Sequence, residues 1–137
     1  MNNPLMRQIL GVIAGVVVGG LIVFCVELVG HSLFPTPPGI DLSNPDDVKR
    51  LIATLPTGAL VMVLVGWALG SLAGAWTANR IARTPMAGWI VGGLFVLMTA
   101  YNFTVIPHPM WMMAVGIAIP FVMAWVASRM TEPRAAS

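Results

Sequence analysis

Residues 84–128 have the sequence TPMAGWIVGGLFVLMTAYNFTVIPHPMWMMAVGIAIPFVMAWVAS, and none of these forty-five residues is Asp, Glu, Lys or Arg. A helix crosses the hydrocarbon of a bilayer in about 20 residues at ~1.5 Å each, so the segment is long enough for two crossings. Pro107-His108-Pro109 marks the turn between them, because proline fixes φ and removes a backbone donor. We therefore expect transmembrane helices near residues 85–105 and 110–129.

Two further stretches without charge precede this segment, at residues 9–26 and 55–79, and they predict transmembrane helices near 6–30 and 57–80. We expect the first to stay uncleaved, because no small-residue cleavage site follows it and it is longer than the apolar region of a signal peptide. Of the 137 residues, 58% are hydrophobic and 9% charged, against roughly 25% charged in soluble domains. The sequence thus predicts an all-α integral membrane protein, a four-transmembrane-helix bundle forming a single domain over residues 1–137.

The basic residues lie unequally on the two sides of the predicted spans. One side holds only Lys49 and Arg50, whereas the other holds five arginines: Arg7, Arg80, Arg83, Arg129 and Arg134. By the positive-inside rule both termini are expected in the cytoplasm and residues 31–55 outside, in the bacterial cytoplasmic (inner) membrane. The net charge of +2 comes largely from these arginines, so it does not indicate a nucleic-acid partner.

The loop between the first two spans contains a helix start. Asn44-Pro45-Asp46-Asp47 supplies an N-cap residue, a proline at the first helical position and acids in the first turn. Apolar residues then recur at helical spacing, at Val48, Leu51, Ile52 and Leu55. We expect a short amphipathic helix near residues 45–55, either a lid over the outer ends of the spans or a docking helix for a partner.

Glycines at four-residue spacing mark the expected packing faces of the spans. They are Gly11, Gly15 and Gly19, then Gly66, Gly70 and Gly74, and finally Gly88 and Gly92. Such GxxxG-type faces allow two interpretations: packing within one chain, with the first two spans antiparallel, or homo-oligomerisation. In the fourth span, Pro120 removes a backbone hydrogen bond and predicts a helix kink.

Four polar side chains form a candidate cluster at the outer ends of the spans: Glu27, His31, Asn102 and His108. Counting about 20 residues from the cytoplasmic arginines puts three of them at similar depth, with His31 one turn further out. At about 100° per residue, Glu27 and His31 share a helix face with Gly20. That face points away from the glycine ridge, so we expect it to meet the fourth span, which begins beside His108.

Three interpretations of this cluster remain open. The side chains could form a hydrogen-bonded staple between the first span and the turn at His108. Glu27, His31 and His108 could instead bind a divalent metal, since a carboxylate and an imidazole at i and i+4 can chelate one ion. The third interpretation is proton or ion handling by Glu27 and His31.

Three short segments together resemble a broad group of small, uncharacterised four-span bacterial inner-membrane proteins: 27–31 (ELVGH), 35–41 (PTPPGID) and 107–111 (PHPMW). The resemblance covers most of the chain and implies the four-span topology and a bacterial origin, with no established activity. Small multidrug transporters are also four-span proteins, but their membrane-embedded glutamate lies in the interior of the first helix. Glu27 lies at the end of its span, which argues against that family.

No phosphate-binding glycine loop, Cys-His metal array or nucleophile elbow occurs in the sequence, so we do not expect an enzyme. We expect a non-enzymatic accessory or structural membrane component without a cofactor. It would act through its glycine and amphipathic faces in the lipid bilayer, as a homo-oligomer or in a larger complex. The alternatives are a small transporter or channel component using Glu27 and His31, and a metal- or haem-binding protein using Glu27, His31 and His108.

Overall fold

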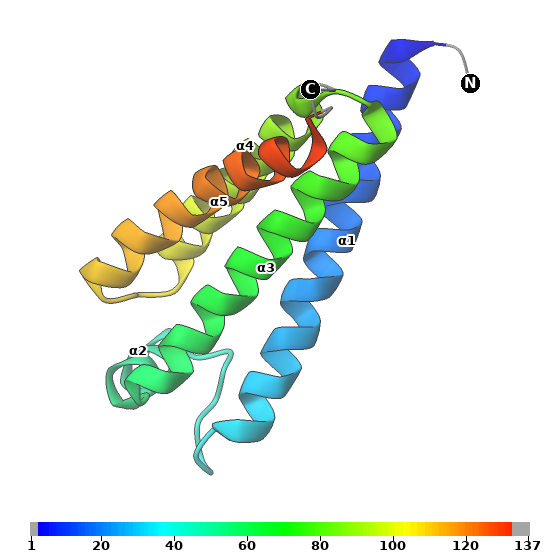
Figure 1. Ribbon diagram of the computed structural model, residues 1–137. Helices are drawn as coiled ribbons and strands as arrows, with labels where there is room; N and C mark the ends of the chain where they lie inside the picture. Colours follow the sequence, from blue (N-terminus) through cyan, green and yellow to red (C-terminus); the bar gives the residue numbers. More distant parts are fainter. Residues whose placement is uncertain (1–2, 133–137) are drawn as a thin grey trace.

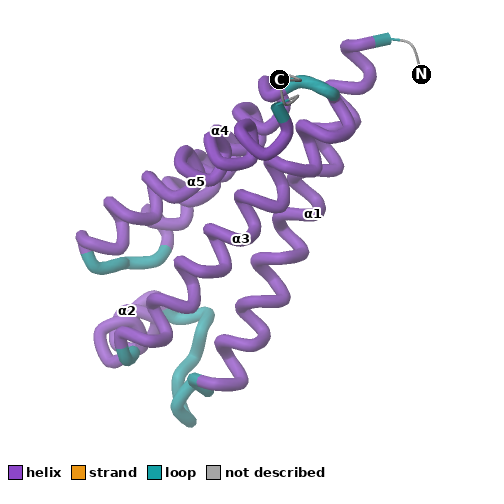
Figure 2. Tube along the Cα trace, viewed as in Figure 1, coloured by secondary structure: helices purple, strands orange, loops and turns teal. Residues whose placement is uncertain are grey.

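The computed structural model describes residues 3–132, and every regular element in that range is helical. The elements are α1 (Pro4–Leu33), α2 (Pro45–Thr54), α3 (Thr57–Ala82), α4 (Pro85–Val105) and α5 (Met110–Thr131). Four of them, α1, α3, α4 and α5, are long and apolar enough to cross a membrane. Short connections join them, except for the longer segment that contains α2 (Figure 1, Figure 2). The predicted set of four long apolar helices is confirmed; Arg134 lies outside the described residues.

Local sequence fixes the start of three helices. α1, α2 and α4 each begin with proline, preceded by Asn3, Asn44 and Thr84 respectively. Each capping side chain accepts a hydrogen bond from the backbone N–H two residues later, at 2.9, 3.0 and 3.4 Å. A backbone N–H at the first position of a helix has no intrahelical partner. Proline, which has no N–H, therefore loses no hydrogen bond there. These caps explain why the helices begin close to where the sequence predicts them.

The central helix of the bundle is α3. It packs against α1, α4 and α5, most extensively against α1, whereas α1 makes a small contact with α4 and none with α5 over the described residues. The α1–α3 pair and the α4–α5 pair lie close together near the chain termini and diverge toward α2 (Figure 1). We call these two ends of the bundle the terminal end and the loop end.

Glycine backbones form the α1–α3 interface. A Cβ atom at Gly15 would lie 2.5 Å from the carbonyl oxygen of Gly74, and one at Gly19 would lie 2.6 Å from that of Gly70. Gly11 approaches the carbonyl oxygen of Ala78 in the same way. Only residues without a Cβ allow two helices to come this close. The two helices are antiparallel, because residues that rise in number along α1 meet residues that fall along α3.

The remaining predicted glycines are also buried in contacts within the chain. Gly66 faces Val26, Gly88 faces Asn79, and Gly92 faces the Ala124 methyl group. These glycines therefore take part in packing contacts within the chain. Pro120 is fully buried inside α5, which continues through it, and a kink at this residue stays a prediction.

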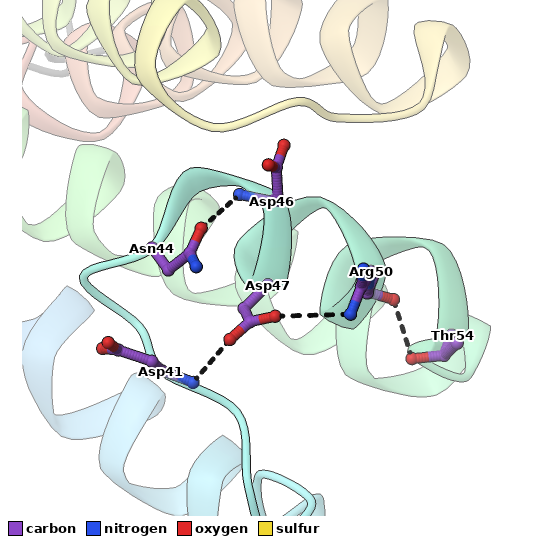
Figure 3. Close-up of polar contacts among 6 residues, drawn as sticks. All are labelled: Asp41, Asn44, Asp46, Asp47, Arg50 and Thr54. Carbon is purple, nitrogen blue, oxygen red and sulfur yellow. Dashed lines mark hydrogen bonds and ion pairs between the residues drawn. The ribbon is translucent and has the colours of Figure 1, made fainter.

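A local polar network orders the segment around α2 (Figure 3). The Asp47 carboxylate accepts a hydrogen bond from the Asp41 backbone N–H at 3.2 Å and lies 3.7 Å from the Arg50 guanidinium. Asp41 accepts bonds from the hydroxyl and the backbone N–H of Ser43, at 2.6 and 2.9 Å. These two bonds lower the pKa of Asp41 because they favour its charged form, and the bond from the Ser43 hydroxyl has the larger effect. Asp41 and Arg50 are exposed, so the network shapes this segment more than it stabilises the whole fold.

Candidate functional site around Glu27

Glu27 lies beside the α1–α3 interface near the loop end. Beyond the glycines, α1 continues to contact α3 through Val23 and Val26. At about 100° per residue, Glu27 is about 40° from Val23 around the helix, so it borders the contact without being enclosed by it. The side chain is partly buried, and no basic side chain of residues 3–132 forms an ion pair with it. Glu27 is therefore a carboxyl group among apolar helices without an ion-pair partner in residues 3–132.

Glu27 lines two separate hollows in the surface of the bundle. The α2 hollow has a volume of about 220 Å³ and is lined by Glu27 and His31 together with apolar residues of α2 and α3. The α4 hollow has a volume of about 260 Å³ and lies between α1, α3 and α4, where Glu27, Trp67 and Asn102 line it. A ligand group in either hollow would be within reach of the same carboxyl group.

His31 shares the α2 hollow with Glu27, but it bonds to the backbone and not to the carboxylate. Its Nδ1 lies 2.9 Å from the backbone carbonyl oxygen of Glu27. Because a carbonyl oxygen only accepts hydrogen bonds, Nδ1 carries the proton, and in the neutral ring Nε2 remains as the acceptor. The predicted i, i+4 neighbours thus lie on one face without forming a side-chain pair.

Asn102 and Gly20 both line the α4 hollow. The Asn102 Oδ1 is buried, and no donor among residues 3–132 reaches it. An unmatched buried acceptor costs about 1–3 kcal/mol. At Gly20 no atom lies within 4 Å of the position that a Cβ would take. The missing side chain of Gly20 leaves the space between α1 and α4 open.

His108 does not join the other members of the predicted cluster. It lies in the α4–α5 turn, and its Nδ1 donates a hydrogen bond to the carbonyl oxygen of Ile106 at 2.7 Å. Its ring packs edge-on against Phe103, with the ring centroids 5.1 Å apart, and lies 6.2 Å from the Trp67 centroid. Over the described residues α1 makes no contact with α5, so the expected packing of the Glu27 face against the fourth span is not seen, and a direct contact with His108 stays a prediction.

Trp67 lies near both Glu27 and His108. Its buried indole extends from α3 and lines the α4 hollow with Glu27, and its ring centroid lies 6.2 Å from that of His108. Gly116 of α5 makes room for the ring, because a Cβ there would lie 2.7 Å from the indole. Within residues 3–132, no three His, Cys, Asp or Glu side chains are grouped so that they could hold a metal ion. A shared ligand set of Glu27, His31 and His108 is not assembled.

A second polar centre, which the sequence interpretation missed, lies at the terminal end. Asn79 is 2% exposed, and its amide joins three helices. Its Nδ2 donates to the Thr131 hydroxyl at 3.1 Å, and its Oδ1 accepts the Gly88 backbone N–H at 2.6 Å. Its backbone carbonyl accepts the N–H of Arg83 at 2.8 Å, where α3 ends. The only sequence signal was a single amide near the end of an apolar span.

Comparison with known proteins gives no match to this chain, whether among family models, curated proteins or solved structures. The fold and the hollows nevertheless define a class of protein. It is a small helical bundle with four helices able to cross a membrane and a partly buried carboxyl group between two hollows.

Proposed function

We propose that this chain is a multi-pass protein of the bacterial cytoplasmic membrane, with both termini in the cytoplasm and residues 31–55 outside. Arginines at the terminal end support this orientation. Arg80 and Arg129 each lie over the ring of the tryptophan one turn earlier, Trp76 and Trp125, with the guanidinium carbon 5.6 Å from the ring centre. Paired aromatic and basic side chains are typical of the boundary between hydrocarbon and headgroups.

Within that membrane, we propose a small transporter or binding protein in which Glu27 holds the positively charged head of an amphiphile. One observation carries the proposal: Glu27 lines both hollows and has no ion-pair partner in residues 3–132. An acidic side chain at membrane depth is costly, and such residues are commonly retained for a ligand or an ion. A bound cation would offset this cost.

The walls of the α4 hollow favour an amphiphilic amine as the ligand. Glu27 offers carboxyl oxygens as acceptors, whereas an ammonium group carries only donors. Trp67 and Phe95 add aromatic rings that attract a cation and pack against an alkyl chain. The volume of about 260 Å³ falls below the roughly 300–1,000 Å³ of pockets that enclose a whole small molecule. It suits a headgroup and the start of a chain that continues into lipid.

The shared position of Glu27 suggests how such a ligand would move. The α4 hollow lies between α1 and α4, which barely touch, so an amine can enter from the lipid side. The α2 hollow lies toward the loop end and is bordered by Glu27 and His31. An amine released from the first hollow would therefore meet the second while it still contacts the same carboxylate.

The accessory role expected from the sequence depended on exposed glycine and amphipathic faces. The eight predicted glycines are buried within the chain, and Leu51 of α2 lines the α2 hollow. The buried glycine faces therefore give no support to the accessory role as a docking surface. It stays a prediction, which stable co-purification with a larger complex in mild detergent would support.

The binding proposal is tested with the full chain in lipid nanodiscs and a dansyl-labelled long-chain alkylamine. Energy transfer from tryptophan to dansyl, corrected with empty nanodiscs, separates saturable binding from partitioning into lipid. The wild-type chain is expected to show saturable binding. Glu27→Gln removes the charge but keeps the shape, and it should weaken binding by about tenfold or more.

Two glycines provide a matched test of the α4 hollow. A Cβ at Gly20 or at Gly93 would meet no atom within 4 Å, but only Gly20 lines the hollow. Gly20→Leu should abolish saturable amine binding, whereas Gly93→Leu should retain it. Unchanged binding in both Glu27→Gln and Gly20→Leu would refute the site. Amine flux into proteoliposomes then distinguishes transport from binding, because a transporter requires flux that falls in Glu27→Gln.

A further inference from the structure

The terminal end carries a third hollow, with a volume of about 420 Å³, beside the α3–α4 turn. In contrast to the two hollows at Glu27, its wall is polar apart from Pro85. We call it the arginine hollow. It is lined by Asn79, Arg80, Arg83, Thr84, Thr131 and Glu132.

Most polar groups in this wall already have partners in the chain. The Asn79 amide uses its two ends on the Gly88 N–H and the Thr131 hydroxyl. The Glu132 carboxylate lies 3.5 Å from the guanidinium of Arg129, which balances its charge. Because Asn79 takes the Gly88 N–H, the first turn of α4 has fewer free donors for a ligand. Recognition in the arginine hollow therefore depends on the arginines.

Arg80 and Arg83 remain without a carboxylate partner among residues 3–132. The guanidinium of Arg80 is held over the Trp76 ring, 5.6 Å from its centre. Arg83 ends α3 with φ 58°, a conformation that is strained for any residue with a Cβ. Guanidinium groups bind phosphate oxygens through paired N–H donors, and two of them border one hollow here.

We propose that the arginine hollow binds the phosphate group of an anionic phospholipid. The inference rests on the proposed membrane location, in which the Arg80–Trp76 and Arg129–Trp125 pairs lie at headgroup depth. A phosphodiester brings a single negative charge to two unpaired guanidinium groups. A zwitterionic lipid would bring its own cation to the same arginines, so it should bind more weakly. Inorganic phosphate offers similar oxygens but no acyl chain to hold it at the bilayer.

The experiment is native mass spectrometry of the full chain in detergent, titrated with phosphatidylglycerol or phosphatidylcholine. The wild-type chain is expected to retain one phosphatidylglycerol at concentrations where phosphatidylcholine is lost. Arg83→Gly removes a guanidinium while glycine accepts the positive φ, so the thermal midpoint should be unchanged or higher. Phosphatidylglycerol retention should nevertheless weaken at least tenfold. Arg80→Gln provides a second variant with the same expected loss.

Arg129 supplies a matched control, because it also lies over a tryptophan but does not line the hollow. Arg80→Gln and Arg129→Gln are each introduced separately into a Glu132→Gln variant, so that the loss of Arg129 leaves no carboxylate unpaired. Adding Arg80→Gln should weaken phosphatidylglycerol retention, and adding Arg129→Gln should not. Equal losses would indicate a general charge effect and overturn the proposal.

Two further outcomes separate the possible failures. Equal retention of the two lipids, or unchanged retention in both Arg83→Gly and Arg80→Gln, would overturn the phosphate site. Displacement of phosphatidylglycerol by millimolar inorganic phosphate would overturn the assignment to a lipid, and no displacement would support it. Recovery of the chain from the soluble fraction of cells would instead contradict the membrane location on which the inference rests.

Discussion

Gly15 and Gly74 bring the backbones of α1 and α3 into direct contact. A Cβ at Gly15 would lie 2.5 Å from the carbonyl oxygen of Gly74, and one at Gly74 would lie 2.7 Å from that of Gly15. The relationship is reciprocal, so neither residue can gain a side chain unless the helices move apart. Because α3 provides most of the contact surface of α1, this pair also sets where Glu27 stands relative to α3 and α4.

Gly15→Val is expected to lower the free energy of unfolding by about 1–3 kcal/mol or more, because overpacking here meets backbone and not a flexible side chain. A Cβ at this position would also lie 3.1 Å from the Val91 side chain. Reversible unfolding in detergent measures the change. Gly93→Val is the control, since its Cβ would meet no atom within 4 Å and should change stability by about 0.5 kcal/mol or less. Equal losses in the two variants would contradict the close contact.

Asn79 and Gly88 should be energetically coupled. Asn79→Ala is expected to cost about 1–3 kcal/mol of unfolding free energy, because buried groups of α4 and α5 lose their partner. Gly88→Ala should also destabilise, since its Cβ would lie 2.5 Å from the Asn79 Oδ1. That clash disappears with the amide, so the double variant should fall short of the summed losses by about 0.5–3 kcal/mol.

Ser71→Ala serves as the control for this cycle. Its hydroxyl oxygen is buried but has no hydrogen-bond partner among residues 3–132, so its removal should leave stability nearly unchanged. Additive losses for Asn79→Ala and Gly88→Ala would contradict the coupling. A loss at Ser71 as large as that at Asn79 would show that burial alone, and not the amide bridge, determines the effect.

The helices could be predicted from the sequence because their causes are local. Charge-free stretches of sufficient length set the four long helices, and Asn44 with Pro45 starts α2. Glycines at four-residue spacing also predicted the packing ridges on α1 and α3, since this spacing forms a ridge on any regular helix, but they left open whether the ridges meet within one chain. Each of these features depends on residues close together in the chain.

The neighbours of Glu27 could not be predicted in the same way. Residue counts from the arginines give depth along the bundle, but they do not tell which helices lie side by side. An ideal helix placed Glu27 and His31 about 120–160° from the middle of the glycine ridge, but beyond Gly19 the contact continues at Val23 and Val26. Trp67 packs against Gly116 and lies near the His108 ring, and His108 is not among the residues that line the α4 hollow. Side-chain shape in three dimensions determines both features.

His108→Ala is expected to reduce the free energy of unfolding by about 0.5–1.5 kcal/mol, because it removes aromatic contacts with Phe103 and Trp67. Amine binding at Glu27 should remain unchanged, in contrast to Glu27→Gln. His108→Phe keeps a ring in the turn and should recover most of the lost stability. Unfolding curves and the dansyl-amine titration measure the two effects. If both His108 variants lost amine binding, His108 would belong to the site after all.

Ser43 should set the pKa of Asp41, because its hydroxyl and then its backbone N–H hold that pKa below the ordinary value of 3.8. With the folded pKa below the unfolded one, the carboxylate stabilises its turn above the unfolded pKa, and this contribution is lost as pH falls through the folded pKa. Ser43→Ala should raise the Asp41 pKa toward its ordinary value, as followed by carbon-13 NMR of the carboxyl group. Ser32→Ala, whose hydroxyl bonds to Leu28, should leave the titration unchanged. An unshifted Asp41 titration in Ser43→Ala would show that the hydroxyl bond does not control this carboxylate.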